Sequence, residues 1–453
     1  MKRNIIIWGL ILMNLFINIS CEKWLEKKPN DNLTVPNNLT DLQGILDNAS
    51  VMNNASPAFD EASADNYFVP PIQYNTLGVR TQEAYTWQLE YYNWPAEWGD
   101  LYLVVNNCNI VLEGIETMER TVSNAQIWDN VKGSALFYRS FSFLKAAFIY
   151  AKAFDESTAS DDYGIVIRLT SDPNAKSVRS TVKQTYEKII EDLKAALTLL
   201  PVTPIHTMRP SRLAVYGTLA RAYLSMRMYD SAYKYADLCL SAKSDLLDYK
   251  TTEVNPSSNT PIPRFNKETI FYSEVGTHAW GGLVPTVGKV DTTLVASYDI
   301  KDMRKKVFLR DFEGYQRFKG SYSSNTLTFF TGIAVDEVLL MRAECLARVG
   351  NTDRAMSDLN QLLEKRWVNG FTPLTAGSAE EALELVLTER RKELIFRGLR
   401  WMDIKRLNKE GRNIVIRRKI GSAIVELPPN DNRYALPLPS DIINQTQMPQ
   451  NPR

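Results

Sequence analysis

The sequence is poor in the side chains that most metal centres and nucleophilic active sites require. Its 453 residues contain only two histidines, His206 and His278, and four cysteines. A zinc centre built on histidine is therefore nearly excluded, and a Ser-His-Asp triad would have to use one of those two histidines. We expect no metal site, no cofactor and no catalytic residue of this kind.

The sequence also has no excess of charge of one sign. Lys and Arg together number 53 and Asp and Glu together number 52, which gives a formal net charge of +1. This balance offers no global attraction to nucleic acid or to an anionic membrane. The hydrophobic share of 44% and the charged share of 23% are typical of a globular protein with a sizeable core.

The N-terminus lacks a hydrophobic run long enough for an obvious membrane span. The apolar run at 5–13 follows Lys2 and Arg3, and Asn14 and Asn18 interrupt the residues after it. Because a spanning helix needs about 20 apolar residues, the pattern at 1–20 predicts a secretory signal peptide. A membrane anchor helix is the alternative.

Cys21 directly follows this segment, in a position that resembles the cleavage site of a bacterial lipoprotein. At such a site the cysteine becomes the first mature residue and carries lipid chains. We therefore predict lipidation of Cys21, and we interpret 21–36 as a tether between the lipid and the folded body. The other cysteines lie far apart in apolar surroundings and are expected to be buried free thiols: Cys108, Cys239 and Cys345.

Apolar residues recur every three to four positions over most of the chain, which predicts a mainly α-helical protein. We expect helices near 38–49, 95–118, 125–154, 181–200, 211–228, 230–243, 334–349, 352–368, 378–397 and 400–408.

The helical pattern is interrupted by an irregular insert at 246–333. The insert is rich in turn residues, and we expect three of its segments to be short strands or irregular structure, at 270–276, 306–310 and 326–332. A C-terminal tail at 411–453 mixes two more β segments with prolines. Because helices flank the insert on both sides, we predict a single domain at 37–453, with its helical scaffold at 37–245 and 334–410.

Two helical segments repeat each other. Residues 219–240 align with residues 342–363, so that Ala220 matches Ala343 and Ala232 matches Ala355 twelve positions later in both copies. Small residues at these points let antiparallel helices approach closely. The pattern predicts tetratricopeptide-like helix pairs that stack into a superhelix, and a chance match between two ordinary helical hairpins is the alternative.

The stretch 389–407 gathers seven basic residues among ten charged ones. Its acids and bases interleave with apolar positions, and Glu393 stands four residues before Arg397, as in a helical ion pair. A phosphate-binding face would lack the acids and place the bases on one side. We therefore predict a structural pair of helices stapled by ion pairs, with Gly398 as the cap of the first, rather than the alternative of a nucleic-acid site.

These residues carry a resemblance to a known family. ERRKELIFRGLRWMDIKR at 389–406 resembles the C-terminal motif of the SusD/RagB family, ER-x-x-EL…F-E-G-x-R-W-x-D-L-x-R, and departs from it at Arg397, where the family has Glu. The tail at 435–452 resembles the closing motif of the family, with Asp441 in place of Glu. Further segments resemble the family in the same order along the chain: 21–29, 98–112, 133–155 and 294–308.

The resemblance implies a function and a partner. Members of this family are surface lipoproteins of the Bacteroidetes that bind glycans without cutting them and form a lid over a SusC-type TonB-dependent transporter of the outer membrane. Their fold combines tetratricopeptide-like helices with an irregular ligand-binding face of short strands. The resemblance therefore implies capture of an oligosaccharide at the extracellular side of the outer membrane, with the lipid at Cys21 as anchor.

Binding of sugar requires exposed aromatic rings for the C–H faces of the pyranose and planar amides or carboxylates for its hydroxyls. Two segments supply both: 85–98, with six aromatics beside Gln88, Glu90 and Asn93, and 277–282, with a tryptophan between a histidine and glycines. A third, 65–71, offers Tyr67 and Phe68. Trp98 and Tyr102, four residues apart on a helix, are expected in the core. The candidate ligand-binding residues are Trp280, Trp94, Tyr91, Tyr92, Tyr67 and Trp87.

Two other functions compete with glycan capture. A glycoside hydrolase needs two carboxylates about 5–10 Å apart in a cleft, which sequence cannot show, and the chain contains no nucleophile motif. Peptide or protein binding is the second alternative, because RagB-type relatives capture peptides.

Overall fold

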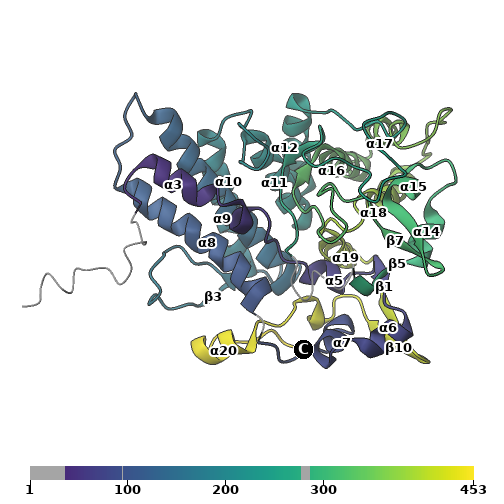
Figure 1. The fold of residues 1–453 in the computed structure, drawn as a ribbon, viewed down its shortest axis with the longest axis horizontal. Coiled ribbons are helices and arrows are strands. Elements are labelled where there is room, and N and C mark those ends of the chain that lie inside the picture. Colours follow the sequence, from purple (N-terminus) through teal and green to yellow (C-terminus); the bar gives the residue numbers. More distant parts are fainter. Residues whose placement is uncertain (1–35, 94, 277–285) are drawn as a thin grey trace, which may run out of the picture.

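The computed structural model describes residues 36–93, 95–276 and 286–453. A layer of antiparallel helices forms its first half: α3 (Leu39–Leu46), α8 (Pro95–Glu116), α9 (Ala125–Tyr150) and α10 (Val182–Leu199). Neighbouring helices of this layer pack on each other (Figure 1). The N-terminus of α10 is fixed by a capping box, in which Thr181 and Gln184 bind each other's backbone N–H.

The two predicted repeats form helix pairs. The first consists of α11 (Arg212–Ser225) and α12 (Tyr229–Ala242), and the second of α16 (Val335–Arg348) and α17 (Thr352–Glu364). Helix α12 packs against α16, so the pairs stack as expected for a superhelix. All four repeat alanines are fully buried, which confirms their role at the close approach of the helices: Ala220, Ala232, Ala343 and Ala355.

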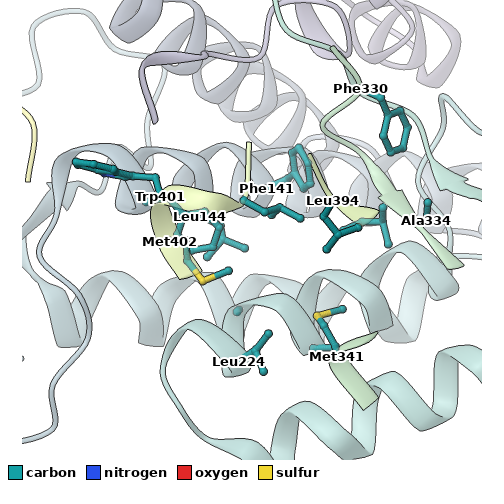
Figure 2. Close-up of a cluster of buried hydrophobic side chains, with 14 of the residues drawn as sticks. Phe141, Leu144, Leu224, Phe330, Ala334, Met341, Leu394, Trp401 and Met402 are labelled. Atoms are coloured by element: carbon teal, nitrogen blue, oxygen red, sulfur yellow. The ribbon is translucent and has the colours of Figure 1, made fainter. Parts of the chain in front are cut away.

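The pairs and the first layer share one core. Phe141 and Leu144 of α9 meet Leu224 of α11 and Met341 of α16 in a cluster that Trp401 and Met402 close from the C-terminal side (Figure 2). The last two come from α19 (Arg400–Asn408), which follows α18 (Ala379–Glu393). Each large side chain buried here contributes about 1.5–3 kcal/mol relative to exposure.

The remaining elements are short. The other helices are α4 (Ala49–Met52), α5 (Phe59–Ser63), α6 (Pro71–Thr76), α7 (Val79–Tyr85), α14 (Thr292–Ser297), α15 (Arg304–Phe308) and α20 (Ser440–Thr446). Five two-stranded antiparallel sheets complete the described part of the chain: β1 (Tyr67–Phe68) with β5 (Lys289–Val290), β2 (Tyr163–Val166) with β3 (Arg179–Thr181), β4 (Thr269–Phe271) with β8 (Ile333–Ala334), β6 (Leu309–Phe312) with β7 (Tyr315–Phe318), and β9 (Ile416–Ile420) with β10 (Ala423–Leu427).

One of the three segments expected in the insert as short strands or irregular structure differs from the prediction. Residues 304–308 form helix α15, and the strand of this region begins only at Leu309. The segment 326–332 forms no regular strand and makes one bridge, between Glu274 and Phe330. Short apolar runs fit a strand and a buried helical turn equally well, and here tertiary packing decides.

The basic stretch 389–407 is a buried ion-pair network, as predicted, but most of its partners lie on other elements. Arg390 does pair with Asp403 inside the stretch, with 2.9 Å between Nε and Oδ2. Glu393 instead accepts from Arg304 and Arg366, and Arg406 donates to Glu344 at 2.7 Å. Although burial raises the pKa of Glu344, the guanidinium of Arg406 outweighs burial and brings the pKa down to about 2.

The predicted pair between Glu393 and Arg397 is wrong. Helix α18 ends at Glu393, so Gly398, whose φ is +67°, is not its cap and Arg397 is not on its face. Arg397 binds Asp336 of α16 instead, at 3.0 Å.

The C-terminal tail binds elements that are distant in sequence. Asn451 donates to the carbonyl oxygens of Tyr150 and Leu436, and Arg453 donates to that of Trp87. These contacts tie the end of the described chain to α9 and to the segment after α7.

The three cysteines in the described residues are buried free thiols, as predicted. In the same residues, no group of histidines, cysteines and carboxylates is arranged to hold a metal ion. The helices described there include none with both the length and the apolar character needed to cross a membrane.

Candidate ligand-binding face

The strands β6 and β7 form a hairpin whose sequence, LRDFEGYQRF, explains its shape. Glu313 and Gly314 connect the strands with φ values of +53° and +78°. Two consecutive residues with positive φ are typical of the tight turns that match the twist of a hairpin, and glycine makes the second one easy. The register pairs Arg310 with Arg317 and Phe312 with Tyr315.

Alternation gives the hairpin two different sides. Leu309 and Phe318 share one side and pack inward, with the ring of Phe318 5.0 Å from that of Phe396. The other side carries the arginine pair and the aromatic pair together. This side is half-buried to exposed, and the ring of Tyr315 is 41% exposed.

Strands β5 and β1 extend this side. Strand β5 packs against β7, and β1 pairs with β5, so the three lie together next to α14 (Figure 1). The ring of Phe312 lies between two cations, with Lys289 Nζ at 4.1 Å and Arg317 Cζ at 4.0 Å from its centre. Phe68 meets Tyr315 edge to face at 5.2 Å. We call this surface the hairpin face; it consists of Phe68, Arg310, Phe312, Tyr315 and Arg317, together with the buried Lys289 that contacts Phe312.

Positive charge dominates the hairpin face. Lys289 pairs with Glu313 at 2.7 Å. Burial lowers the pKa of Arg317, and the neighbouring cation Arg310 lowers it further. The same two causes, in the same order, lower the pKa of Lys319. Crowding of cations is therefore a property of the whole face.

The recess at the hairpin face, between Gly288, Arg310, Arg317 and Phe396, holds only about 10 Å³ and cannot enclose a sugar ring. A surface of this shape suits an extended chain lying across it better than an enclosed small molecule. Rings at its edge can stack on the apolar faces of sugars, and guanidinium and ammonium groups can donate to oxygens.

A larger groove of about 550 Å³ lies elsewhere, between α8, the loop around Arg168 and α20. Trp98 and Tyr102 form part of its wall and stack on each other at 4.5 Å. Trp98 is only 6% exposed, which confirms its predicted place in the core.

Three of the predicted ligand-binding aromatics are buried, and their assignment to the ligand is corrected. Tyr67, Trp87 and Tyr92 are each 1% exposed. Their polar atoms bind the backbone: Tyr67 Oη donates to the Ala62 carbonyl at 2.6 Å, Trp87 Nε1 to that of Ser63 at 3.0 Å, and Tyr92 Oη to that of Pro437 at 2.8 Å. None presents a ring face to a ligand.

For Tyr67 and Trp87 the physical reason is a buried cation that the sequence did not reveal, whereas Tyr92 is held by the C-terminal tail. The guanidinium of Arg418, on β9, lies over the rings of Tyr67 at 4.8 Å, Tyr85 at 4.3 Å and Trp87 at 5.3 Å. It also donates to the backbone carbonyls of Tyr67 and Ala64. The aromatics around residue 85 thus serve to hold the tail against α5 and β1.

The other predicted residues remain predictions. Tyr91 is 73% exposed and is free to meet a ligand. Trp94, Trp280 and the lipidation site Cys21 lie outside the described residues.

The sequence reasoning missed most of the hairpin face. Of the residues on this face, the sequence pattern indicated only Phe68 as an aromatic near a candidate ligand site. The signal was present as alternation around Glu-Gly: arginine and phenylalanine two positions apart before the turn, tyrosine and arginine two positions apart after it.

Comparisons with known proteins place the fold. A family model described as "Starch-binding associating with outer membrane" matches residues 23–224, and the model of the SusD family matches residues 330–453. SusD-like protein P2 of Formosa agariphila is 24% identical, over 79% of this chain and 80% of that protein.

Two solved structures share the architecture. A SusD superfamily protein from Bacteroides thetaiotaomicron has a TM-score of 0.74 at 22% identity, covering 92% of this chain and 100% of that one. A SusD-like carbohydrate binding protein from Bacteroides vulgatus has a TM-score of 0.68 at 21% identity, covering 91% and 97%. These likenesses confirm the predicted tetratricopeptide-like helical fold.

Proposed function

Because the chain belongs to the SusD/RagB family, we propose that it is a surface lipoprotein that captures oligosaccharides and delivers them to a SusC-type TonB-dependent transporter. The family consists of binding proteins rather than enzymes, so the captured saccharide would pass on uncut.

The observation that carries saccharide binding is the open ring of Tyr315, which lies beside Phe68 on a face rich in hydrogen-bond donors. A rigid exposed ring with polar groups around it is what a pyranose requires. The family model describes starch binding, and the similar Bacteroides vulgatus protein is a SusD-like carbohydrate binding protein. Both support the same class of ligand.

The lipid at Cys21 and the transporter are the remaining parts of the proposal. The description of the family model places its members at the outer membrane. Several lipid chains on one cysteine anchor a protein more firmly than a single chain does. A Cys21→Ala variant should therefore leave the membrane fraction for the soluble fraction. Retention of that variant on the membrane would contradict the proposed lipid anchor.

Calorimetry with a panel of oligosaccharides and peptides tests the choice of ligand. We expect heat of binding from saccharides and a loss of about five-fold in affinity for Tyr315→Ala, since a stacked ring contributes about 1 kcal/mol. Tyr163, equally exposed on β2, is the matched control, and Tyr163→Ala should bind normally. Tyr91→Ala, Trp94→Ala and Trp280→Ala test the predicted aromatics in the same assay. Binding of peptides alone would overturn the proposal in favour of a peptide-binding nutrient lipoprotein.

A further inference from the structure

Arg310 and Arg317 stand directly opposite each other on the two strands of the hairpin. Residues paired in this way project from the same side of a sheet, and like charges in such pairs are destabilising. Both guanidiniums lie beside one ring, with Cζ 6.0 Å (Arg310) and 4.0 Å (Arg317) from the centre of Phe312. The hairpin therefore holds two cations in an unfavourable arrangement.

No carboxylate neutralises this pair in the part of the chain that the structure describes. On this face Glu313 pairs with Lys289 instead. Asp311, the other acid of the hairpin, alternates to the opposite side, where it accepts a hydrogen bond from Gln316. Glu313 also attracts Arg317 through space, but within the described residues neither arginine forms an ion pair with a carboxylate.

Most donors of the two arginines also lack an acceptor within the described residues. Arg310 donates to Asn259 Oδ1 at 3.3 Å, and Arg317 donates to the Thr286 carbonyl. The Nε of each is buried and has no hydrogen-bond partner. A guanidinium carries five N–H donors in a planar fork that matches a carboxylate or sulfate. The face is built as a receptor whose acceptor comes from outside.

We infer that the ligand of the hairpin face is an acidic saccharide, whose carboxylate or sulfate groups bind Arg310 and Arg317 while Tyr315 and Phe68 contact its rings. This inference rests on the proposed function and adds the charge of the substrate to it. Hydrogen bonds between ionised groups are about twice as strong as neutral ones, so charge would dominate the affinity.

Native gels that contain a polysaccharide test the inference with pairs of polymers that share a backbone and differ in charge. The pairs are dextran with dextran sulfate, and methyl-esterified pectin with polygalacturonate. We expect the purified protein to be retarded by an anionic member at about one tenth of the concentration that its neutral partner needs. The first pair reports on sulfate and the second on carboxylate.

Variants locate the effect on the hairpin. Arg310→Gln with Arg317→Gln should weaken retardation by the anionic polymer about ten-fold or more. Arg417→Gln is the matched control, because Arg417 lies on the other exposed hairpin and has Glu426 opposite it. The double variant should melt within a few degrees of the unmodified protein, because the repulsion that is removed offsets the lost attraction of Arg317 to the ring of Phe312. This readout separates lost binding from lost folding.

Each of the other possible results of the gel experiment contradicts a specific part of the inference. Retardation by the neutral polymers alone would overturn the acidic ligand and leave saccharide binding intact. Retardation by the anionic polymers that survives in the double variant would overturn the role of the two arginines. No retardation by any polymer would overturn both the inference and the proposed saccharide binding.

Discussion

Two hairpins of this molecule use arginine in opposite ways. In β9–β10, Arg417 faces Glu426 across the strands and binds it at 2.7 Å, while Arg418 turns inward and is wrapped by aromatic rings and carbonyls. In β6–β7, Arg310 faces Arg317, and neither finds an acid among the described residues. Both hairpins have tight turns with positive φ, so the backbone does not explain the difference. The arginines of β9–β10 stabilise the fold, whereas those of β6–β7 remain without an ion-pair partner at the surface.

The largest effect should follow from removing the buried cation of the first hairpin. Arg418→Leu leaves the carbonyls of Tyr67 and Ala64 without a donor and removes a cation from three rings. We expect a loss of about 3–5 kcal/mol in the free energy of unfolding, measured by urea denaturation. Arg417→Leu, one residue away and 60% exposed, should change it by less than about 1 kcal/mol. Equal losses of unfolding free energy in Arg418→Leu and Arg417→Leu would contradict the distinction between a buried and an exposed arginine.

Acid should separate buried from exposed ion pairs. The pKa of Glu344 is about 2 in the folded protein and 4.5 ordinarily, because Arg406 outweighs the effect of burial. Its contribution is complete above pH 4.5 and is lost as pH falls from 4.5 to 2. The loss should be about 3 kcal/mol, visible as a falling urea midpoint.

The matched variants assign this loss to its residue. In Glu344→Gln the urea midpoint should fall less steeply between pH 4.5 and 2. In Glu426→Gln, on the exposed hairpin, it should fall as steeply as in the unmodified protein. An unchanged slope in Glu344→Gln would contradict the assignment.

Phe312 should contribute more to the free energy of unfolding than its partial exposure indicates, because its ring contacts both Lys289 and Arg317. Phe312→Leu removes the attraction of both cations to the ring and should lower the free energy of unfolding by about 1–2 kcal/mol. A double-mutant cycle with Arg317→Gln measures the coupling between ring and cation. Additive effects would show that the ring does not hold the cations.

The smallest effect should come from converting one hairpin into the pattern of the other. Arg310→Glu places opposite charges across β6–β7, as in β9–β10, and should raise the free energy of unfolding by about 0.2–1 kcal/mol. The same variant should lose binding of an acidic polymer. A variant that is less stable and still binds would contradict the view that this pair is kept for its ligand.

Periodicity predicted the scaffold well because helix pairs depend on local spacing. Ala220 and Ala343 are recognisable from sequence since a close approach of helices demands a small residue wherever the fold places it. The site was harder to predict. Tyr67, Trp87 and Tyr92 have the composition of a sugar platform. The exposure of Tyr67 and Trp87 is decided by Arg418, more than 300 residues away, and Tyr92 is held by the tail at Pro437. Likewise the spacing of four residues predicts a helical pair between Glu393 and Arg397. Helix α18 ends at Glu393, however, and Arg397 binds Asp336.

The contacts of the tail have a consequence for the timing of folding. Arg418 and Asn451 close a core whose other half is made of residues before 151. A nascent or translocating chain cannot complete that core until its last segment has arrived, and loop closure over such lengths is slow. For a protein exported through a narrow channel this delay is useful, because the chain stays threadable until almost all of it has crossed.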